Sequence, residues 1–218
     1  LAYDELFFVQ MEMAARRRLA EHAKVGRVLK ISDHLDHRIR LRFPFKLTRA
    51  QDRAIWDLRR ELSGERPMNR LLQGDVGSGK TLVAAYAVLA AVGNRAQAAV
   101  MAPTEILAEQ HFRTFTRMLA GSRVRMAILG GGPKTKGRME TLKRIAAGEV
   151  DLVIGTHAVI QKDVVFNELA LVVIDEQQKF GVMQRAALRR KGKGPHVLVA
   201  TATPIPRTLA LTLYGDLD

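Results

Sequence analysis

The amino-acid sequence predicts an α/β protein built on a doubly wound, mainly parallel sheet. From residue 43 onward, short apolar runs alternate with segments of helical periodicity, which is the pattern of βαβ units. A glycine-rich loop joins the first of these strands to a helix, and two acidic residues follow a fully apolar strand. Because ligands of such sheets collect at the carboxyl ends of the strands, we expect the functional residues at that edge.

The first 42 residues precede this alternation. Residues 1 to about 30 predict one long helix that is apolar on both sides, with Tyr3 and Leu6 on one and Phe7 and Phe8 on the other, so it should be buried against a partner. Residues 32–42 are polar and predict a solvated connector. Asp and His occur there at spacings seen in metal sites, but no third ligand cluster lies nearby in the sequence.

Six strands and five helices are expected after residue 42. The strands are predicted at residues 71–73, 98–101, 124–129, 152–154, 171–174 and 197–200, and the helices at 48–62, 82–92, 104–119, 137–147 and 206–214.

The run from Gly74 to Thr81 predicts a binding site for a nucleoside triphosphate. Its glycines let backbone N–H groups point into one concavity, Lys80 can reach the β and γ phosphates, and the Thr81 hydroxyl can ligate Mg²⁺. A chance glycine-rich turn is the alternative, and the order of strand, loop and helix argues against it. The nucleotide-binding residues expected here are Gly74, Gly77, Ser78, Gly79, Lys80 and Thr81.

Residues 171–176 combine four apolar residues with two acids, which predicts a buried strand ending in carboxylates. Asp175 would hold Mg²⁺, and Glu176 would orient and deprotonate the attacking water, since phosphoryl transfer depends on positioning and charge neutralisation. The alternative is that both acids only end a strand at the surface. The phosphate loop requires such a pair and favours the catalytic interpretation.

The charge of the chain favours a polyanionic partner. Its 218 residues include 35 Lys and Arg against 22 Asp and Glu, a net charge of +13, which suits sequence-independent binding to nucleic acid phosphates. There is no cysteine, no run of about 18 apolar residues and no signal-peptide pattern. We therefore expect a soluble, intracellular protein with no membrane partner.

Several short motifs resemble those of superfamily-two helicases, and they occur in the same order. The residues 45–51 resemble the adenine-reading motif, which assigns Phe45 and Gln51 to the base of ATP. Other motifs resemble nucleic-acid contacts, which implies DNA binding by Pro103, Thr104, Gly130, Gly131, Gly155, Thr156 and His157. The motifs that couple hydrolysis to movement in this superfamily match Gln178, Thr201 and Thr203.

Within that superfamily, the stretches LLQGDVGSGKT, APTEILAEQH, GTHAVIQ and TATPIPRTLALTLYGDLD resemble the RecG family of bacterial branched-DNA helicases. The resemblance implies an ATP- and Mg²⁺-dependent translocase on double-stranded DNA that remodels stalled replication forks and Holliday junctions in recombination and repair. Residues 43–218 would be the first RecA-like motor lobe, and residues 1–42 a helical connector following a wedge domain. The chain begins at Leu1 and not at Met, so we expect the wedge domain to precede it, and it ends at Asp218, so we expect the second lobe to follow it, in a cytoplasmic, nucleoid-associated protein.

One position departs from the RecG pattern, since Gln178 stands where the family is expected to have histidine. Three alternatives stay open. Transcription-repair coupling translocases share the stretch at 201–208, although Ser78 and Gln177 favour RecG. A small-molecule P-loop kinase would need an acceptor pocket where the nucleic-acid motifs lie. The third alternative is a nucleotide- and DNA-binding module that is inactive alone.

Overall fold

The computed structural model describes residue 11 and residues 26–130, 136–175 and 194–202. The helix expected at 206–214 lies outside these ranges, as does most of the one expected at 1–30. Residue 11 is helical, but residues 26–32 are not, so the first helix does not extend to residue 30 as expected. Instead the Leu29 N–H donates to the Leu62 carbonyl at 2.8 Å. No helix in the described ranges has both the length and the apolarity to cross a membrane.

The alternation of strands and helices is confirmed, and each boundary predicted after residue 42 within the described ranges falls within two residues of the observed one. The strands are β1 (Asn69–Gln73), β2 (Gln97–Met101), β3 (Met126–Leu129), β4 (Leu152–Gly155), β5 (Leu169–Asp175) and β6 (His196–Thr201). The helices are α2 (Asp33–Arg40), α3 (Arg49–Leu62), α4 (Lys80–Gly93), α5 (Glu105–Met118) and α6 (Lys136–Ala146), with a 3₁₀ turn, η1, at His157–Ile160.

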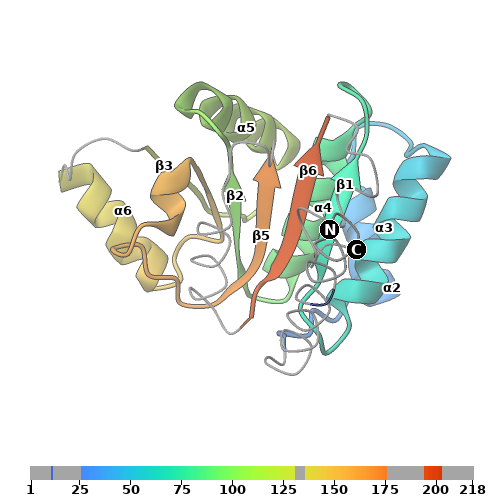
Figure 1. The fold of residues 1–218 in the computed structure, drawn as a ribbon, viewed down its shortest axis with the longest axis horizontal. Helices are drawn as coiled ribbons and strands as arrows, with labels where there is room; N and C mark the ends of the chain where they lie inside the picture. Colours follow the sequence, from blue (N-terminus) through green and yellow to red (C-terminus); the bar gives the residue numbers. More distant parts are fainter. Residues whose placement is uncertain (1–10, 12–25, 131–135, 176–193, 203–218) are drawn as a thin grey trace, which may run out of the picture.

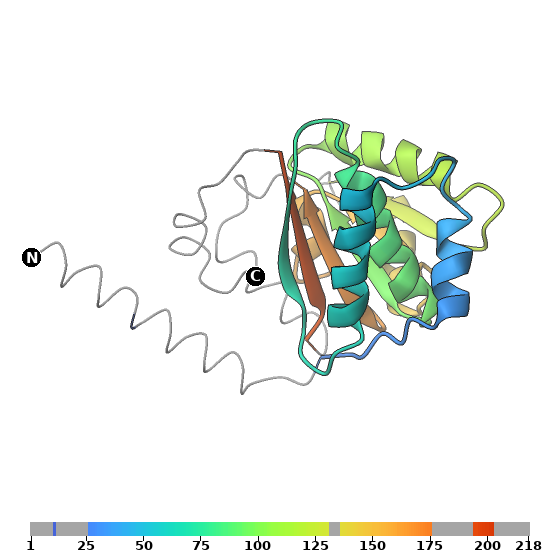
Figure 2. The same cartoon turned by 90° about the vertical axis from the view of Figure 1, so that its right-hand side faces the viewer.

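All six strands are parallel and lie in the order β1-β6-β5-β2-β4-β3. Helices α2, α3, α4 and α5 cover one face, and α6 with η1 covers the other (Figures 1 and 2). Alternate residues of each central strand enter the two separate cores, as in Leu171 and Val173 on the α4 side and Val172 and Ile174 on the α6 side. This alternation decides which helix each strand-end side chain faces.

Helix α2 corrects the expectation of a solvated connector at 32–42. Ser32 caps the helix by accepting a hydrogen bond from the Leu35 N–H at 3.2 Å, and Ile39 is buried in the core. The Tyr86 hydroxyl of α4 donates to Asp36, which also pairs with Arg40 at 2.8 Å. Burial and the contact with Asp36 raise the pKa of Tyr86 above its ordinary value. Both acids of α2 and its last arginine therefore have partners, since Asp33 pairs with Arg59 at 2.6 Å.

Helix α4 lies at the centre of the helical layer. Its apolar residues surround it on all sides, and ten of its residues are buried, which is the pattern of a helix with no solvent-facing side. The helix begins at Lys80, within the phosphate loop. The loop is therefore attached to one of the most enclosed elements of the molecule.

Candidate nucleotide and nucleic-acid site

The carboxyl edge of the sheet divides into two halves. Three neighbouring strands, β1, β6 and β5, end at the phosphate loop, Thr201 and Asp175, whereas β2, β4 and β3 end at the residues predicted to contact nucleic acid. In Figure 1 the arrowheads of β5 and β6 point toward this edge, and α5 lies beside it. Because β6 separates β1 from β5, the loop and Asp175 lie two strand spacings apart, roughly 10 Å. The two predicted functions therefore occupy adjoining parts of one edge.

The phosphate loop adopts the geometry that its glycines predict. Gly77 and Gly79 have φ values of 81° and 85°, a left-handed conformation that side chains with a Cβ rarely adopt. The Lys80 ammonium donates to the carbonyls of Gly74 at 2.6 Å and Asp75 at 2.8 Å, so it lies over its own loop. Thr81 follows in the first turn of α4. The backbone N–H groups at the start of α4 and the positive charge of Lys80 favour the binding of an anion at this loop.

Gln51 joins helix α3 to this loop. Its side-chain amide donates to the Ser78 carbonyl at 3.0 Å, and its oxygen accepts from the Thr48 N–H at 2.9 Å. The Thr48 hydroxyl in turn accepts from the Gln51 N–H, which completes a capping box at the start of α3. A Cβ at Gly79 would displace this amide, in addition to the strain that its φ of 85° would impose on any other residue. Phe45 precedes Gln51 closely in the sequence. Its side chain is 59% exposed, so the ring is accessible for an aromatic contact with a base.

Asp175 forms the end of β5 and contacts helix α5. Its Oδ2 lies 2.6 Å from Nε2 of His111, and both side chains are partly buried. Since an ionised carboxylate can only accept, Nε2 of His111 donates. The second carboxylate oxygen and the remaining lone pairs stay available for another ligand.

The donor set suits Mg²⁺ held together with phosphates. The described ranges contain no group of three or more His, Cys, Asp or Glu residues that would enclose a metal. Mg²⁺ is normally bound through one or two carboxylates plus substrate phosphates and water, and not by a complete protein cage. The Asp175 carboxylate and the Thr81 hydroxyl are hard oxygen donors of this kind, so the residues present fit the ion.

Strand β6 connects the two sides of the nucleotide half. The Gly74 N–H donates to the Thr201 carbonyl at 3.3 Å, and Thr201 is buried. In the register of the sheet, Asp175 pairs with Ala200 and Gln73 with Thr201. The predicted coupling residue Thr201 thus lies between the phosphate loop and the strand that carries Asp175.

The predicted nucleic-acid residues come together at the ends of β2, β4 and β3, but they are not equally accessible. Thr104 caps α5 by accepting from the Leu107 N–H at 3.3 Å, and His157 is exposed. Thr156 is 3% exposed, and its hydroxyl has no hydrogen-bond partner in the described ranges. The side chain of Thr156 therefore faces the interior, and a contact from this turn would use backbone groups or His157.

Backbone proximity explains the glycine at position 155. A Cβ at Gly155 would collide with the Leu129 carbonyl, and the Gly155 carbonyl accepts from the Ala102 N–H at 2.9 Å. The Gly130 carbonyl at the end of β3 accepts from Arg138 of α6 at 2.9 Å. These contacts tie the ends of β2, β4 and β3 into one surface. Pro103 connects β2 to Thr104 in the same surface.

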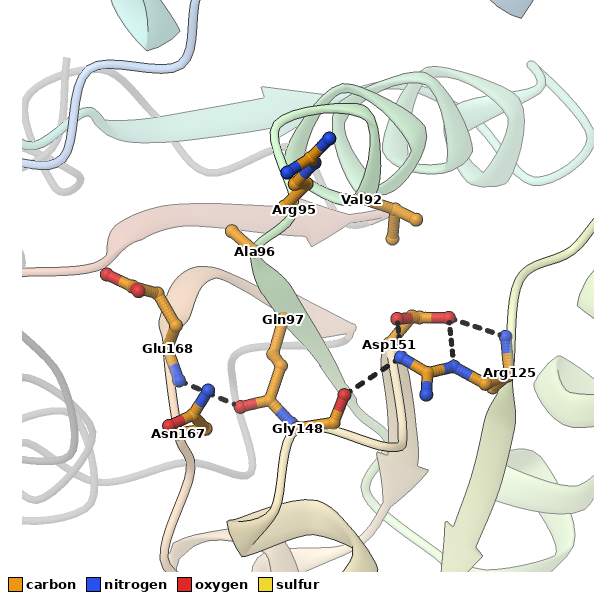
Figure 3. A pocket seen from close by; sticks show the side chains of 9 residues that line it. All are labelled: Val92, Arg95, Ala96, Gln97, Arg125, Gly148, Asp151, Asn167 and Glu168. Carbon is orange, nitrogen blue, oxygen red and sulfur yellow. Dashed lines mark hydrogen bonds and ion pairs between the residues drawn. The ribbon is translucent and has the colours of Figure 1, made fainter.

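A cavity of about 310 Å³ lies away from this site, at the amino ends of the strands (Figure 3). Several of its polar groups already have partners: Gln97 bonds the carbonyls of Ile145 and Val150 and the Glu168 N–H, and Arg125 pairs with Asp151 at 2.8 Å. Its lining residues are Val92, Arg95, Ala96, Gln97, Arg125, Gly148, Asp151, Asn167 and Glu168. These contacts stabilise the edge of the sheet at the amino ends of the strands, so we assign the cavity a structural role.

Four predicted site residues, Gly131, Glu176, Gln178 and Thr203, lie outside the described residues. In the other direction, sequence reasoning missed His111. A signal existed, because Ala108, His111 and Phe115 recur at helical spacing and His111 is the polar member of this inner stripe of α5. A polar residue on an otherwise apolar helix face needs a partner, and Asp175 is that partner.

Comparison with known proteins agrees with the geometry. The chain is 49% identical over 218 residues to the ATP-dependent DNA helicase RecG of Aquifex aeolicus, which covers 99% of this chain and 27% of the relative. It is 47% identical over 224 residues to RecG of Escherichia coli K12, which covers 100% of this chain and 32% of the relative. The chain thus spans about a third or less of the length of these relatives.

Solved structures show the same fold. The structure of RecG bound to a three-way DNA junction superposes with a TM-score of 0.83 at 42% identity, over 99% of this chain and 30% of that chain. A DEAD box protein from Methanococcus jannaschii superposes with a TM-score of 0.63 at 23% identity, over 86% of this chain and 53% of that chain, which supports the fold alone. The predicted RecA-like lobe and the likeness to RecG are confirmed. Residues 48–212 match the family described as DEAD/DEAH box helicase, and the chain belongs to that family.

Proposed function

We propose that this chain is the ATP-binding first motor lobe of a DNA helicase that moves on double-stranded DNA. The observation that carries the proposal is the arrangement of the carboxyl edge, where the Lys80 loop and Asp175 share one edge with the turn containing Thr156 and His157, and β5 of the nucleotide half lies next to β2 of the other half. A motor must convert hydrolysis in one place into movement on DNA in another. Adjoining sites on one rigid sheet edge suit that task.

Each residue has a distinct part in ATP hydrolysis. Lys80 would exchange its two loop carbonyls for phosphate oxygens, and Asp175 with Thr81 would hold Mg²⁺. The ion would neutralise charge on the phosphates. Glu176, which follows Asp175 directly in the sequence, would orient the attacking water and accept its proton. Phe45 and Gln51 would bind adenine.

DNA binding is proposed to be independent of base sequence. Thr104 and His157, with backbone groups at Gly130, Gly155 and Thr156, would contact phosphates, and the net charge of +13 favours such binding. Phosphate contacts position a protein without reading bases, as a motor that steps along any DNA requires. Pro103 and Gly131 flank these groups in the sequence, and Thr201 and Thr203 would transmit the state of the nucleotide.

The preferred substrate is proposed from the relatives. A RecG has been solved on a three-way DNA junction, and this chain covers 30% of that protein. We propose that the full-length gene product remodels branched DNA, including stalled forks and Holliday junctions. A wedge domain and a second motor lobe of the same polypeptide are its proposed partners, and residues 1–42 its proposed connector to the wedge.

The test is DNA-stimulated ATP hydrolysis by the full-length gene product. We expect stimulation by a three-way junction to exceed that by linear duplex of equal length, and Lys80→Ala to abolish both. Absence of stimulation by any DNA would contradict the motor function and favour a binding module. Equal stimulation by junction and linear duplex would contradict the branched substrate, and would favour a translocase of the transcription-repair coupling type.

A further inference from the structure

Among the described residues, a direct side-chain hydrogen bond between α5 and β5 joins the two halves of the sheet edge. His111 belongs to the helix that begins in the predicted nucleic-acid motif, and Asp175 belongs to the nucleotide half. The Nε2–Oδ2 distance is 2.6 Å, and the two side chains are 15% and 23% exposed. Limited exposure restricts competition from water, so this hydrogen bond holds both groups more firmly than a surface pair.

The contact follows from the periodicities of the two elements. Leu171, Val173 and Asp175 point to the same face of the sheet because strand side chains alternate, and that face is the one α5 covers. On α5, His111 shares the inner stripe with Ala108 and Phe115, both buried in the same core. The anchored stripe leaves His111 little freedom to move independently of the helix.

Helix α5 also has its amino end in the predicted DNA surface. Thr104 caps the helix there, and His111 lies seven residues further along, roughly 10 Å at 1.5 Å per residue. A displacement of this end by DNA would be carried along a hydrogen-bonded helix to His111. The displacement would then reach the Asp175 carboxylate through the hydrogen bond.

We propose that His111 is a positioning residue that sets the orientation of the Asp175 carboxylate toward Mg²⁺ and links it to the DNA surface through α5. The proposal rests on the proposed function and adds to it a route by which DNA changes the metal site. His111 occupies one oxygen of the carboxylate and leaves the other for the ion. Residues that orient a metal ligand in this way commonly change metal affinity 10- to 100-fold when removed.

The first experiment measures metal binding and not activity. Mn²⁺ affinity of the full-length gene product with bound ADP is determined by electron paramagnetic resonance for wild type, His111→Ala, His111→Leu and His111→Gln. We expect the Ala and Leu variants to bind Mn²⁺ roughly 10-fold more weakly, and Gln, whose amide can donate to Asp175, to restore most of the affinity. His111→Leu retains volume, so it keeps the test valid if the smaller Ala side chain lowers folding stability.

A matched control lies on the same helix. The Thr116 hydroxyl donates to the Phe112 carbonyl of its own helix at 2.8 Å, and Thr116→Ala should bind Mn²⁺ as wild type does. Wild-type affinity in His111→Leu, or equal affinities in His111→Leu and His111→Gln, would overturn the positioning role.

The second experiment tests the link to DNA. We expect the ratio of DNA-stimulated to basal ATP hydrolysis to fall toward one in His111→Leu and to recover in His111→Gln, with DNA affinity by fluorescence anisotropy unchanged. A wild-type ratio in His111→Leu would overturn the link. If DNA did not stimulate the wild-type protein, that result would instead contradict the proposed function. The metal-binding experiment uses no DNA, so its outcome would still test the positioning role of His111.

Discussion

The Gln51 side chain donates a hydrogen bond to the Ser78 carbonyl at 3.0 Å, so helix α3 holds the phosphate loop in place. The same side chain accepts from the Thr48 N–H as half of the capping box. One residue thus performs two separable tasks, and two substitutions distinguish them.

Gln51→Ala removes both contacts, whereas Gln51→Glu keeps an acceptor for the cap and loses the donor to Ser78. We expect Gln51→Ala to lower the free energy of unfolding by about 1 kcal/mol, as for loss of one intramolecular hydrogen bond, and Gln51→Glu to unfold close to wild type. Both should weaken ATP binding and reduce the preference for ATP over GTP. Urea denaturation and nucleotide titration measure these effects, and unchanged affinity in Gln51→Glu would contradict the role of the loop contact.

Lys80 and Glu176 should give different defects. Lys80→Ala removes the cation that lies over the loop, so we expect weaker nucleotide binding and no hydrolysis. Glu176→Gln should retain ATP and Mg²⁺ but lose hydrolysis, because the amide cannot accept the proton from water. Equilibrium binding and single-turnover assays separate the two steps. Turnover by Glu176→Gln at the wild-type rate would show that another group is the base.

Substitutions in the nucleic-acid half should weaken binding to all DNA sequences alike. His157→Ala removes an exposed side chain and should lower affinity for two unrelated duplexes by the same factor. Thr104→Ala also removes the α5 cap, and Thr104→Ser is its control, because serine preserves the cap. Anisotropy titrations with both duplexes test this. A change in preference between the sequences would show that bases are read.

The free energy of unfolding should decrease as the pH is lowered, because His196 is buried in its neutral form. This buried ring accepts the Met68 N–H at Nδ1, 2.9 Å away, and donates from Nε2 to the Arg27 carbonyl at 2.7 Å. Burial lowers the pKa of His196 below its ordinary value, although the contact with Arg27 opposes the shift. Its stabilising contribution is therefore present above the unfolded pKa of about 6.5 and is lost as pH falls through the lower folded pKa.

The non-titrating variant His196→Asn provides the comparison. We expect it to be less stable than wild type near neutral pH and to lose less stability on acidification. Urea midpoints measured at successive pH values from neutral to mildly acidic give both curves. Parallel curves for wild type and variant would show that His196 does not contribute to the pH dependence.

The fold was largely predictable because the central strands of a parallel sheet are covered by helices on both faces, so their sequences are continuous apolar runs. Leu171 to Ile174 illustrate this, since all four are buried from both sides. Helix α2 was not predictable by that rule. Most of its residues are ionisable, and their partners, such as Tyr86 for Asp36, come from distant parts of the chain.

The site was predictable where one short segment contains all its chemistry, as in the loop from Gly74 to Thr81. It was not predictable where function depends on pairing between segments, as for His111 with Asp175. Burial of the Thr156 side chain was also hidden in the sequence, because hydroxyl residues are common in surface motifs. Local patterns identify residue types, and only the tertiary fold assigns their partners.

Among the strands that the structure describes, β1 pairs with β6 alone, and the contact between Met68 and His196 spans 128 positions of sequence. A ribosome that has made the phosphate loop must therefore translate more than half of this chain before the strand beneath the loop gains its neighbour. Such long-range pairing is slow to form. The nascent lobe should consequently acquire its affinity for nucleotide late in synthesis, when the emergence of β6 completes the support of the loop.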